Sequence, residues 1–284
     1  MYQTLIEAET LRRNLDVPDW RVFDCRCSPA DPAAGRKAWL TGHIPGARHA
    51  DLDRVLAAAP SATTGRHPLP ARETLTNWFA SEGVDAKTQV VAYDDVGGAF
   101  AARLWWLMRW LGHEAVAVLD GGLSAWRENG GEIESGETSA PEPADFQAGE
   151  PSVKFLRAEE TLAIVRGEAP GVLSDARAAP RYRGETEPLD PVAGHIPGAR
   201  NFPYAGNLDE QGHFLGTKDL RERFAALAAD NPARVVHYCG SGVTACHNLL
   251  AMEHAGLAGS RLYAGSWSEW IRDPARPVAR GEEE

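Results

Sequence analysis

The sequence has few cysteines, no long apolar run and a deficit of positive charge. Four cysteines among 284 residues are too few for a disulfide scaffold, so free thiols are expected. No stretch of about 20 apolar residues is present, which argues against a membrane-spanning helix. The chain has 29 Lys and Arg against 40 Asp and Glu, a net charge of −11. This charge argues against a nucleic acid or an anionic membrane as the main partner.

The first nine residues also lack the pattern of a secretory signal. They carry acidic side chains where a signal needs basic residues followed by an apolar core. We therefore expect a cytoplasmic protein. The acidic surface does not exclude an anionic small substrate, because a local pocket can be positive inside it.

What the sequence does contain is an internal repeat. Residues 42–48 read GHIPGAR and recur letter for letter at residues 194–200. Other landmarks keep the same order in both halves: residues 22–26 and 173–177, 90–94 and 235–239, and 120–126 and 264–270. Chance matches would not preserve their order over such a length, so two homologous domains in tandem are predicted. We expect a first domain over 1–138, a Pro- and Glu-rich linker over 139–152 and a second domain over 153–284.

Each half alternates short apolar runs with longer helical patterns. Residues 21–23, 89–93 and 116–119 look like buried strands, and residues 101–111 and 244–255 look like helices. This alternation predicts an α/β fold in which a parallel sheet is flanked by helices. Ligands of such sheets bind beyond the carboxyl ends of the strands, so the chemistry is expected at a strand-to-helix junction.

The junction at Cys239 is the strongest candidate. The predicted strand 234–238 ends at this cysteine, and Gly240 and Gly242 let the following backbone curl toward one point. The positive end of the next helix and the loop N–H groups would favour a thiolate and hold an anion. A buried structural cysteine is the alternative interpretation. The first half has Asp94 at this place, which predicts one active and one inactive half.

Together, the tandem repeat, the GHIPGA turns and the loop CGSGVT at 239–244 resemble the rhodanese family of two-domain sulfurtransferases. The loop is most similar to the 3-mercaptopyruvate sulfurtransferase branch. The resemblance implies two tandem rhodanese-like domains, an inactive first one and a catalytic second one, with the active site at the cleft between them. It implies a Cys239 persulfide that takes sulfur from 3-mercaptopyruvate and passes it to a thiol (thioredoxin or a small thiol) or to cyanide.

No cofactor is needed for these steps. Substrate binding by the loop is implied for Gly240, Gly242, Val243 and Thr244.

The same resemblance assigns roles outside the loop. Arg181 matches a substrate-binding arginine of the family and would grip a carboxylate. The mercaptopyruvate branch often has a second arginine just after a Glu-Pro step, whereas residues 187–190 read EPLD here. That departure favours the thiosulfate branch, so thiosulfate remains an alternative donor.

A proton relay is implied for Ser241, His67 and Asp53, with Asp51 competing for the place of Asp53. Such a relay would help the donor thiol to lose its sulfur. The alternative for His67 is a loop histidine held by Pro68.

Three other interpretations of the sequence are a phosphatase, a metal site and a module without turnover. A phosphatase of the Cys-x5-Arg type needs an arginine where this chain has Ala245, so phosphoryl transfer is disfavoured. Cys25 and Cys27 lack further ligands nearby, and no metal site is predicted. A sulfur carrier or protein-binding module with little turnover remains a second alternative, because fold does not fix function.

Overall fold

The computed structural model describes residues 1–228 and 231–282 and divides them into two compact units. Unit 1 comprises residues 1–58, 69–152 and 210–214, and unit 2 comprises residues 59–68, 153–209 and 215–284 apart from the residues not described. Two short segments therefore belong to a unit that their place in the sequence does not suggest. Residues 59–68 are grouped with unit 2, and residues 210–214 with unit 1.

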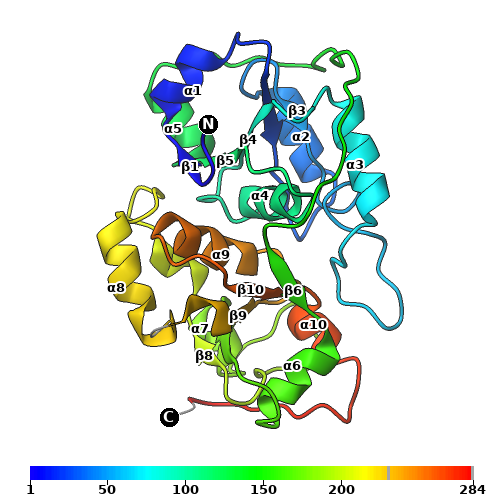
Figure 1. Ribbon diagram of the computed structural model, residues 1–284, viewed down its shortest axis with the longest axis vertical. Helices are drawn as coiled ribbons and strands as arrows, with labels where there is room; N and C mark the ends of the chain where they lie inside the picture. Colours follow the sequence, from blue (N-terminus) through cyan, green and yellow to red (C-terminus); the bar gives the residue numbers. More distant parts are fainter. Residues whose placement is uncertain (229–230, 283–284) are drawn as a thin grey trace. The chain divides into compact units, whose positions relative to one another are not determined.

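Unit 1 is a five-stranded parallel sheet in the order β1-β5-β4-β2-β3 (Figure 1). Its strands are β1 (Leu5–Ile6), β2 (Trp20–Asp24), β3 (Arg48–His49), β4 (Gln89–Tyr93) and β5 (Val116–Leu119). Its helices are α1 (Ala8–Asn14), α2 (Ala34–Thr41), α3 (Arg72–Ser81), α4 (Ala101–Trp110) and α5 (Gly122–Glu128).

Unit 2 repeats this topology with the strand order β6-β10-β9-β7-β8. Its strands are β6 (Lys154–Leu156), β7 (Val172–Asp175), β8 (Arg200–Asn201), β9 (Val235–Tyr238) and β10 (Arg261–Tyr263). Its helices are α6 (Ala158–Val165), α7 (Ala179–Tyr182), α8 (Thr217–Ala228), α9 (Ala245–His254) and α10 (Ser266–Trp270), with 3-10 turns η1 (Tyr204–Asn207) and η2 (Pro232–Arg234). The predicted α/β class, with two parallel sheets flanked by helices, is confirmed.

Both faces of each sheet are covered, which explains the nearly continuous apolar strands. In β9 the alternate residues Val236 and Tyr238 pack in one core with Trp267 of α10. His237, between them, turns to the other face and lies 3.0 Å from the sulfur of Met252 in α9. The carboxyl end of β9 is thereby fixed between two helical layers, and the loop that follows it starts from a rigid position.

The strand before each repeated turn is locked to the turn by an arginine. Arg177 pairs with Asp175 at 2.7 Å and also donates to the carbonyl of Gly194 at 2.7 Å. Arg26 of unit 1 makes the equivalent contacts. Since both units have this Arg–Asp pair, we assign it a role in stabilising the fold rather than in one functional site.

Within the described residues, no helix is long and apolar enough to cross a membrane.

Candidate active site

Cys239 is the first residue after β9, at the carboxyl edge of the unit 2 sheet, and is 2% exposed. Its backbone N–H donates to the hydroxyl of Ser266 at 3.1 Å, and its carbonyl accepts the N–H of Trp267 at 3.0 Å. Both partners lie at the start of α10. The nucleophile predicted from the sequence is therefore held from two sides by its backbone.

Ser266, which holds the backbone N–H of Cys239, itself has an unusual backbone conformation. It is fully buried with φ +55°, and its hydroxyl donates to the carbonyl of Tyr263 at 2.9 Å. The equivalent residue of unit 1 is Gly122, with φ +56°. A serine is more strained in this left-handed region than a glycine would be, and here its hydroxyl accepts the hydrogen bond from the backbone N–H of Cys239. The sequence reasoning missed Ser266, although the comparison of Gly122 with Ser266 was available.

Gly242 directs a backbone donor at the sulfur. Its N–H donates to Sγ of Cys239 at 3.2 Å. The residue has φ +80°, and a Cβ built on it would lie 2.2 Å from the carbonyl oxygen of Ala264. Only glycine fits this turn. The loop thus supplies a partial positive charge at the place where a sulfur anion would form.

The other loop residues shape the turn around this contact. The carbonyl of Gly240 accepts the N–H of Ser268 at 2.9 Å, and Val243 is buried with its carbonyl accepting from Cys246 at 3.0 Å. Thr244 is the N-cap of α9. Substrate binding by Gly240, Gly242, Val243 and Thr244 stays a prediction.

Ser241 and His67 lie together within unit 2. Nδ1 of His67 is 2.7 Å from the hydroxyl of Ser241, although 174 positions separate them in the chain. This contact agrees with the grouping of residues 59–68 with unit 2. Asp53 belongs to unit 1, where its backbone N–H donates to the carboxylate of Asp51 at 2.9 Å. Its pairing with His67 stays a prediction.

Arg181 is fixed by two carboxylates. It donates to Glu187 through Nη2 at 2.7 Å and through Nε at 3.2 Å, and Nη2 lies 3.5 Å from Asp190. Burial opposes the charge on Glu187, but hydrogen bonds from Arg181 and from the backbone of Leu189 and Asp190 lower the pKa of Glu187 overall. The carboxylate is therefore ionised at neutral pH and holds the guanidinium in place.

A second guanidinium reaches the same loop. A side chain at position 240 would collide with it, because a Cβ built there would lie 2.9 Å from Nη2 of Arg66 and 3.4 Å from Nη2 of Arg181. Arg66 also pairs with Asp190. The sequence reasoning did not single out Arg66. Nothing in the sequence alone points to Arg66, since the missing arginine of the EPLD run favours only the thiosulfate branch.

In unit 1 an aspartate replaces the thiol at the equivalent strand end. The buried carboxylate of Asp94 accepts the backbone N–H groups of Val96, Gly98, Phe100 and Ala101 at 2.8–2.9 Å. The carboxyl group of Asp94 thus occupies the position where unit 2 has its sulfur.

The remaining cysteines of unit 1 are held as thiols. Burial raises the pKa of Cys25 well above its ordinary value. Burial, together with the carboxylates of Asp94 and Asp53, also raises the pKa of Cys27. Among the described residues, no group of three or more His, Cys, Asp and Glu side chains is placed to hold a metal ion.

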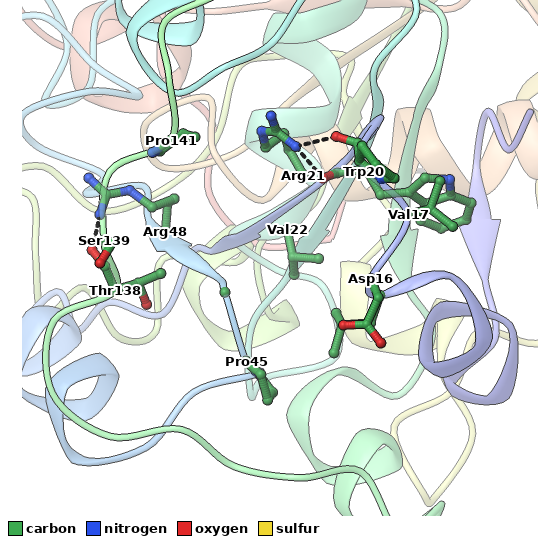
Figure 2. A pocket seen from close by; sticks show the side chains of 13 residues that line it. Asp16, Val17, Trp20, Arg21, Val22, Pro45, Arg48, Thr138, Ser139 and Pro141 are labelled. Carbon is green, nitrogen blue, oxygen red and sulfur yellow. Dashed lines mark hydrogen bonds between the residues drawn. The ribbon is translucent and has the colours of Figure 1, made fainter.

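Unit 1 also contains a cavity of about 410 Å³ beside β2 and β3. Figure 2 shows that its arginines are engaged with backbone carbonyls: Arg21 with Trp20 at 2.8 Å and Arg48 with Thr138 at 2.5 Å. No residue predicted for catalysis lines it.

Comparisons with known proteins agree with this geometry. The family described as rhodanese-like domain matches residues 7–129 and again residues 158–273. The chain is 50% identical over 281 residues to the probable 3-mercaptopyruvate sulfurtransferase of Pseudomonas aeruginosa, covering 98% of each. It is 40% identical over 285 residues to a putative thiosulfate sulfurtransferase of Mycobacterium tuberculosis, again covering 98% of each.

Among solved structures, 3-mercaptopyruvate sulfurtransferase from Leishmania major is similar, with a TM-score of 0.83 and 32% identity. The match covers 94% of this chain and 74% of that one. Since the family's domain matches both halves and close relatives span nearly the whole sequence, this chain belongs to the rhodanese family.

Proposed function

We propose that this protein is a sulfurtransferase that moves a sulfur atom from 3-mercaptopyruvate to an acceptor through a persulfide on Cys239. The observation that carries the proposal is the sulfur of Cys239 at a strand end with the N–H of Gly242 aimed at it at 3.2 Å. Ser241 with His67 and Arg181 with Glu187 lie in the same unit and supply a hydroxyl–imidazole pair and a fixed cation. The 50% identical relative carries the name of this activity.

In the first step the Cys239 thiolate attacks the sulfur of the donor. An S–S bond forms, the donor C–S bond breaks, and its electron pair goes to the methylene carbon. The thiol proton of the donor ends on that carbon, which gives pyruvate and a Cys239–S–S⁻ anion. The Ser241–His67 pair would carry the proton, and the Gly242 N–H would stabilise the anion.

In the second step an acceptor thiol, either on thioredoxin or on a small molecule, attacks the outer sulfur. The S–S bond to Cys239 breaks, the cysteine leaves as thiolate, and the acceptor becomes a persulfide. Cyanide reacts in the same way to give thiocyanate. A neutral sulfur atom is gained by Cys239 in the first step and lost in the second, so the cycle returns the cysteine to its thiolate, and neither step needs a cofactor or a metal. We propose a cytoplasmic location for this reaction.

Thiosulfate is the second candidate donor. The 40% identical mycobacterial relative is named for it, and Leu189 and Asp190 stand where the mercaptopyruvate branch often has an arginine. The test is kcat/KM for each donor with cyanide or dithiothreitol as acceptor. We expect 3-mercaptopyruvate to be preferred at least tenfold. Preference for thiosulfate would reverse the assignment of the donor. If neither donor gave measurable sulfur transfer, the alternative of a sulfur carrier or protein-binding module would be favoured.

Replacing His67 by glutamine is expected to lower kcat with 3-mercaptopyruvate by roughly 100-fold, the scale of general acid–base catalysis. The amide can still hydrogen-bond Ser241 but cannot carry a proton. Discharge of a preformed persulfide to cyanide moves no donor proton, so its rate should stay near wild type. Equal loss in both half-reactions would contradict the relay and indicate a general disturbance of the loop.

A further inference from the structure

We propose that Arg66 is a substrate-binding residue that, together with Arg181, clamps the carboxylate of the 2-oxo acid donor across Gly240. This inference rests on the proposed function and adds a residue to its binding site. It explains how the chain can bind a carboxylate although the EPLD run lacks the arginine that the mercaptopyruvate branch often has there.

The position of Arg66 is built rather than accidental. Its backbone N–H donates to the buried hydroxyl of Ser268 at 3.0 Å. Gly65, just before it, packs so closely that a Cβ there would lie 2.6 Å from the carbonyl of Gly265. The segment that carries Arg66 is therefore fixed against the start of α10, the same helix that holds the backbone of Cys239.

Asp190 contacts both guanidinium groups and leaves one nitrogen of each without a hydrogen bond to it. Its carboxylate pairs with Nη1 of Arg66 and lies 3.5 Å from Nη2 of Arg181. Within the described residues, Nη2 of Arg66 and Nη1 of Arg181 make no hydrogen bond. A Cβ on Gly240 would lie 2.9 Å from the first and 3.5 Å from the second. Nη2 of Arg66 and Nη1 of Arg181, both with N–H groups still able to donate, therefore lie next to Gly240, the residue that follows the nucleophile.

Gly240 leaves room for this arrangement, since a Cβ there would lie 2.9 Å from Nη2 of Arg66 and would shift the end of that side chain, whereas its 3.4–3.5 Å distances to Arg181 are ordinary contacts. The thiosulfate branch typically has basic residues at this point of the loop, whereas this chain has Gly240 and Ser241. The positive charge here comes from outside the loop instead. Each guanidinium offers one uncommitted nitrogen here, and two such charged donors can bind the two oxygens of one carboxylate.

The charge balance also favours a donor with one negative charge. Asp190 and Glu187 offset the charges of Arg66 and Arg181, so the four side chains together are neutral. A monoanionic 2-oxo acid adds less repulsion beside a cysteine thiolate than dianionic thiosulfate does.

The test is Arg66→Gln, with Arg200→Gln as a matched control. Arg200 is an exposed arginine of the same unit that donates to the carbonyl of Ala226 at 2.8 Å. We expect Arg66→Gln to raise KM for 3-mercaptopyruvate and the inhibition constant of pyruvate by roughly 10- to 100-fold, the scale of a lost charged hydrogen bond. Discharge of a persulfide loaded from inorganic polysulfide should be unchanged, and Arg200→Gln should resemble wild type throughout.

Two further variants separate binding from stability. Arg66→Gln leaves Asp190 without its partner, so Arg66→Gln/Asp190→Asn restores a neutral pair and should still bind pyruvate weakly. Leu189→Arg, placed in the Arg66→Gln background at an exposed position, should recover much of the lost affinity by supplying a cation from the EPLD run.

The outcomes distinguish this inference from the proposed function. A wild-type protein that transfers sulfur, with an Arg66→Gln variant of equal KM and equal pyruvate affinity, overturns the role of Arg66 alone. A wild-type protein that transfers sulfur from neither donor overturns the proposed function itself.

Discussion

Replacing Cys239 by serine is expected to abolish sulfur transfer, with turnover falling by more than about 10³-fold, as when a covalent nucleophile is removed. The hydroxyl is nearly isosteric but is not ionised near neutral pH and cannot hold a sulfur atom as a persulfide. The backbone contacts of residue 239 to Ser266 and Trp267 do not involve the side chain, so the fold should persist. The measurement is turnover with both donors, together with the unfolding midpoint.

Cys246 provides the matched control. It is the buried second residue of α9, and its thiol donates to the carbonyl of Gly242 at 3.4 Å. Cys246→Ser keeps that donor and should retain sulfur transfer. Intact-mass analysis after exposure to donor should show one added sulfur atom in this control and none in Cys239→Ser. Turnover by Cys239→Ser, or an added sulfur on it, would contradict the assignment of the nucleophile.

The elements that carry the site were predictable because their signals are local. The apolar run at 89–93 is strand β4 with the same bounds, and the helical pattern at 101–111 is α4. The strand, glycine turn and helix around Cys239 likewise follow from contiguous residues. Buried strands and glycine turns are recognisable from the residue types at a few neighbouring positions, and the internal repeat shows the same pattern twice.

The surroundings of the loop were harder to predict because they depend on contacts between distant residues. His67 could be proposed from the family resemblance, but nothing in residues 59–68 shows that this segment is grouped with unit 2. Arg66 became visible only through its distance to Gly240. Ser266 needed the backbone angle that it shares with Gly122. Side chains that complete a site from another part of the chain have no periodic signature.

The contrast between Cys239 and Asp94 suggests how one half keeps the loop without the chemistry. Each residue directly follows the equivalent strand, and the side chain of each accepts backbone N–H groups of the loop that follows. In unit 1 the acceptor is a fixed carboxylate that cannot leave or exchange sulfur. The same loop therefore serves stability in one half and, on our proposal, catalysis in the other.

Asp94→Ala is accordingly expected to destabilise unit 1 by roughly 3–5 kcal/mol, because several buried backbone donors lose a charged acceptor. Asp94→Asn keeps one of the two carboxylate oxygens as an acceptor and should cost about half as much. The measurement is urea unfolding followed by probes in each half, since a chain of two units need not unfold in one step.

Asp95→Ala is the matched control, because Asp95 is the neighbouring carboxylate but is exposed. It should change the unfolding free energy by less than about 1 kcal/mol. Under conditions where each variant is folded, all three should transfer sulfur at the wild-type rate, because Asp94 has no part in the proposed steps. A large loss of turnover in folded Asp94→Asn would contradict the division into one active and one inactive half. An unchanged unfolding midpoint in Asp94→Ala would instead show that water replaces the carboxylate at no cost, and that the loop of unit 1 is stable without its anion.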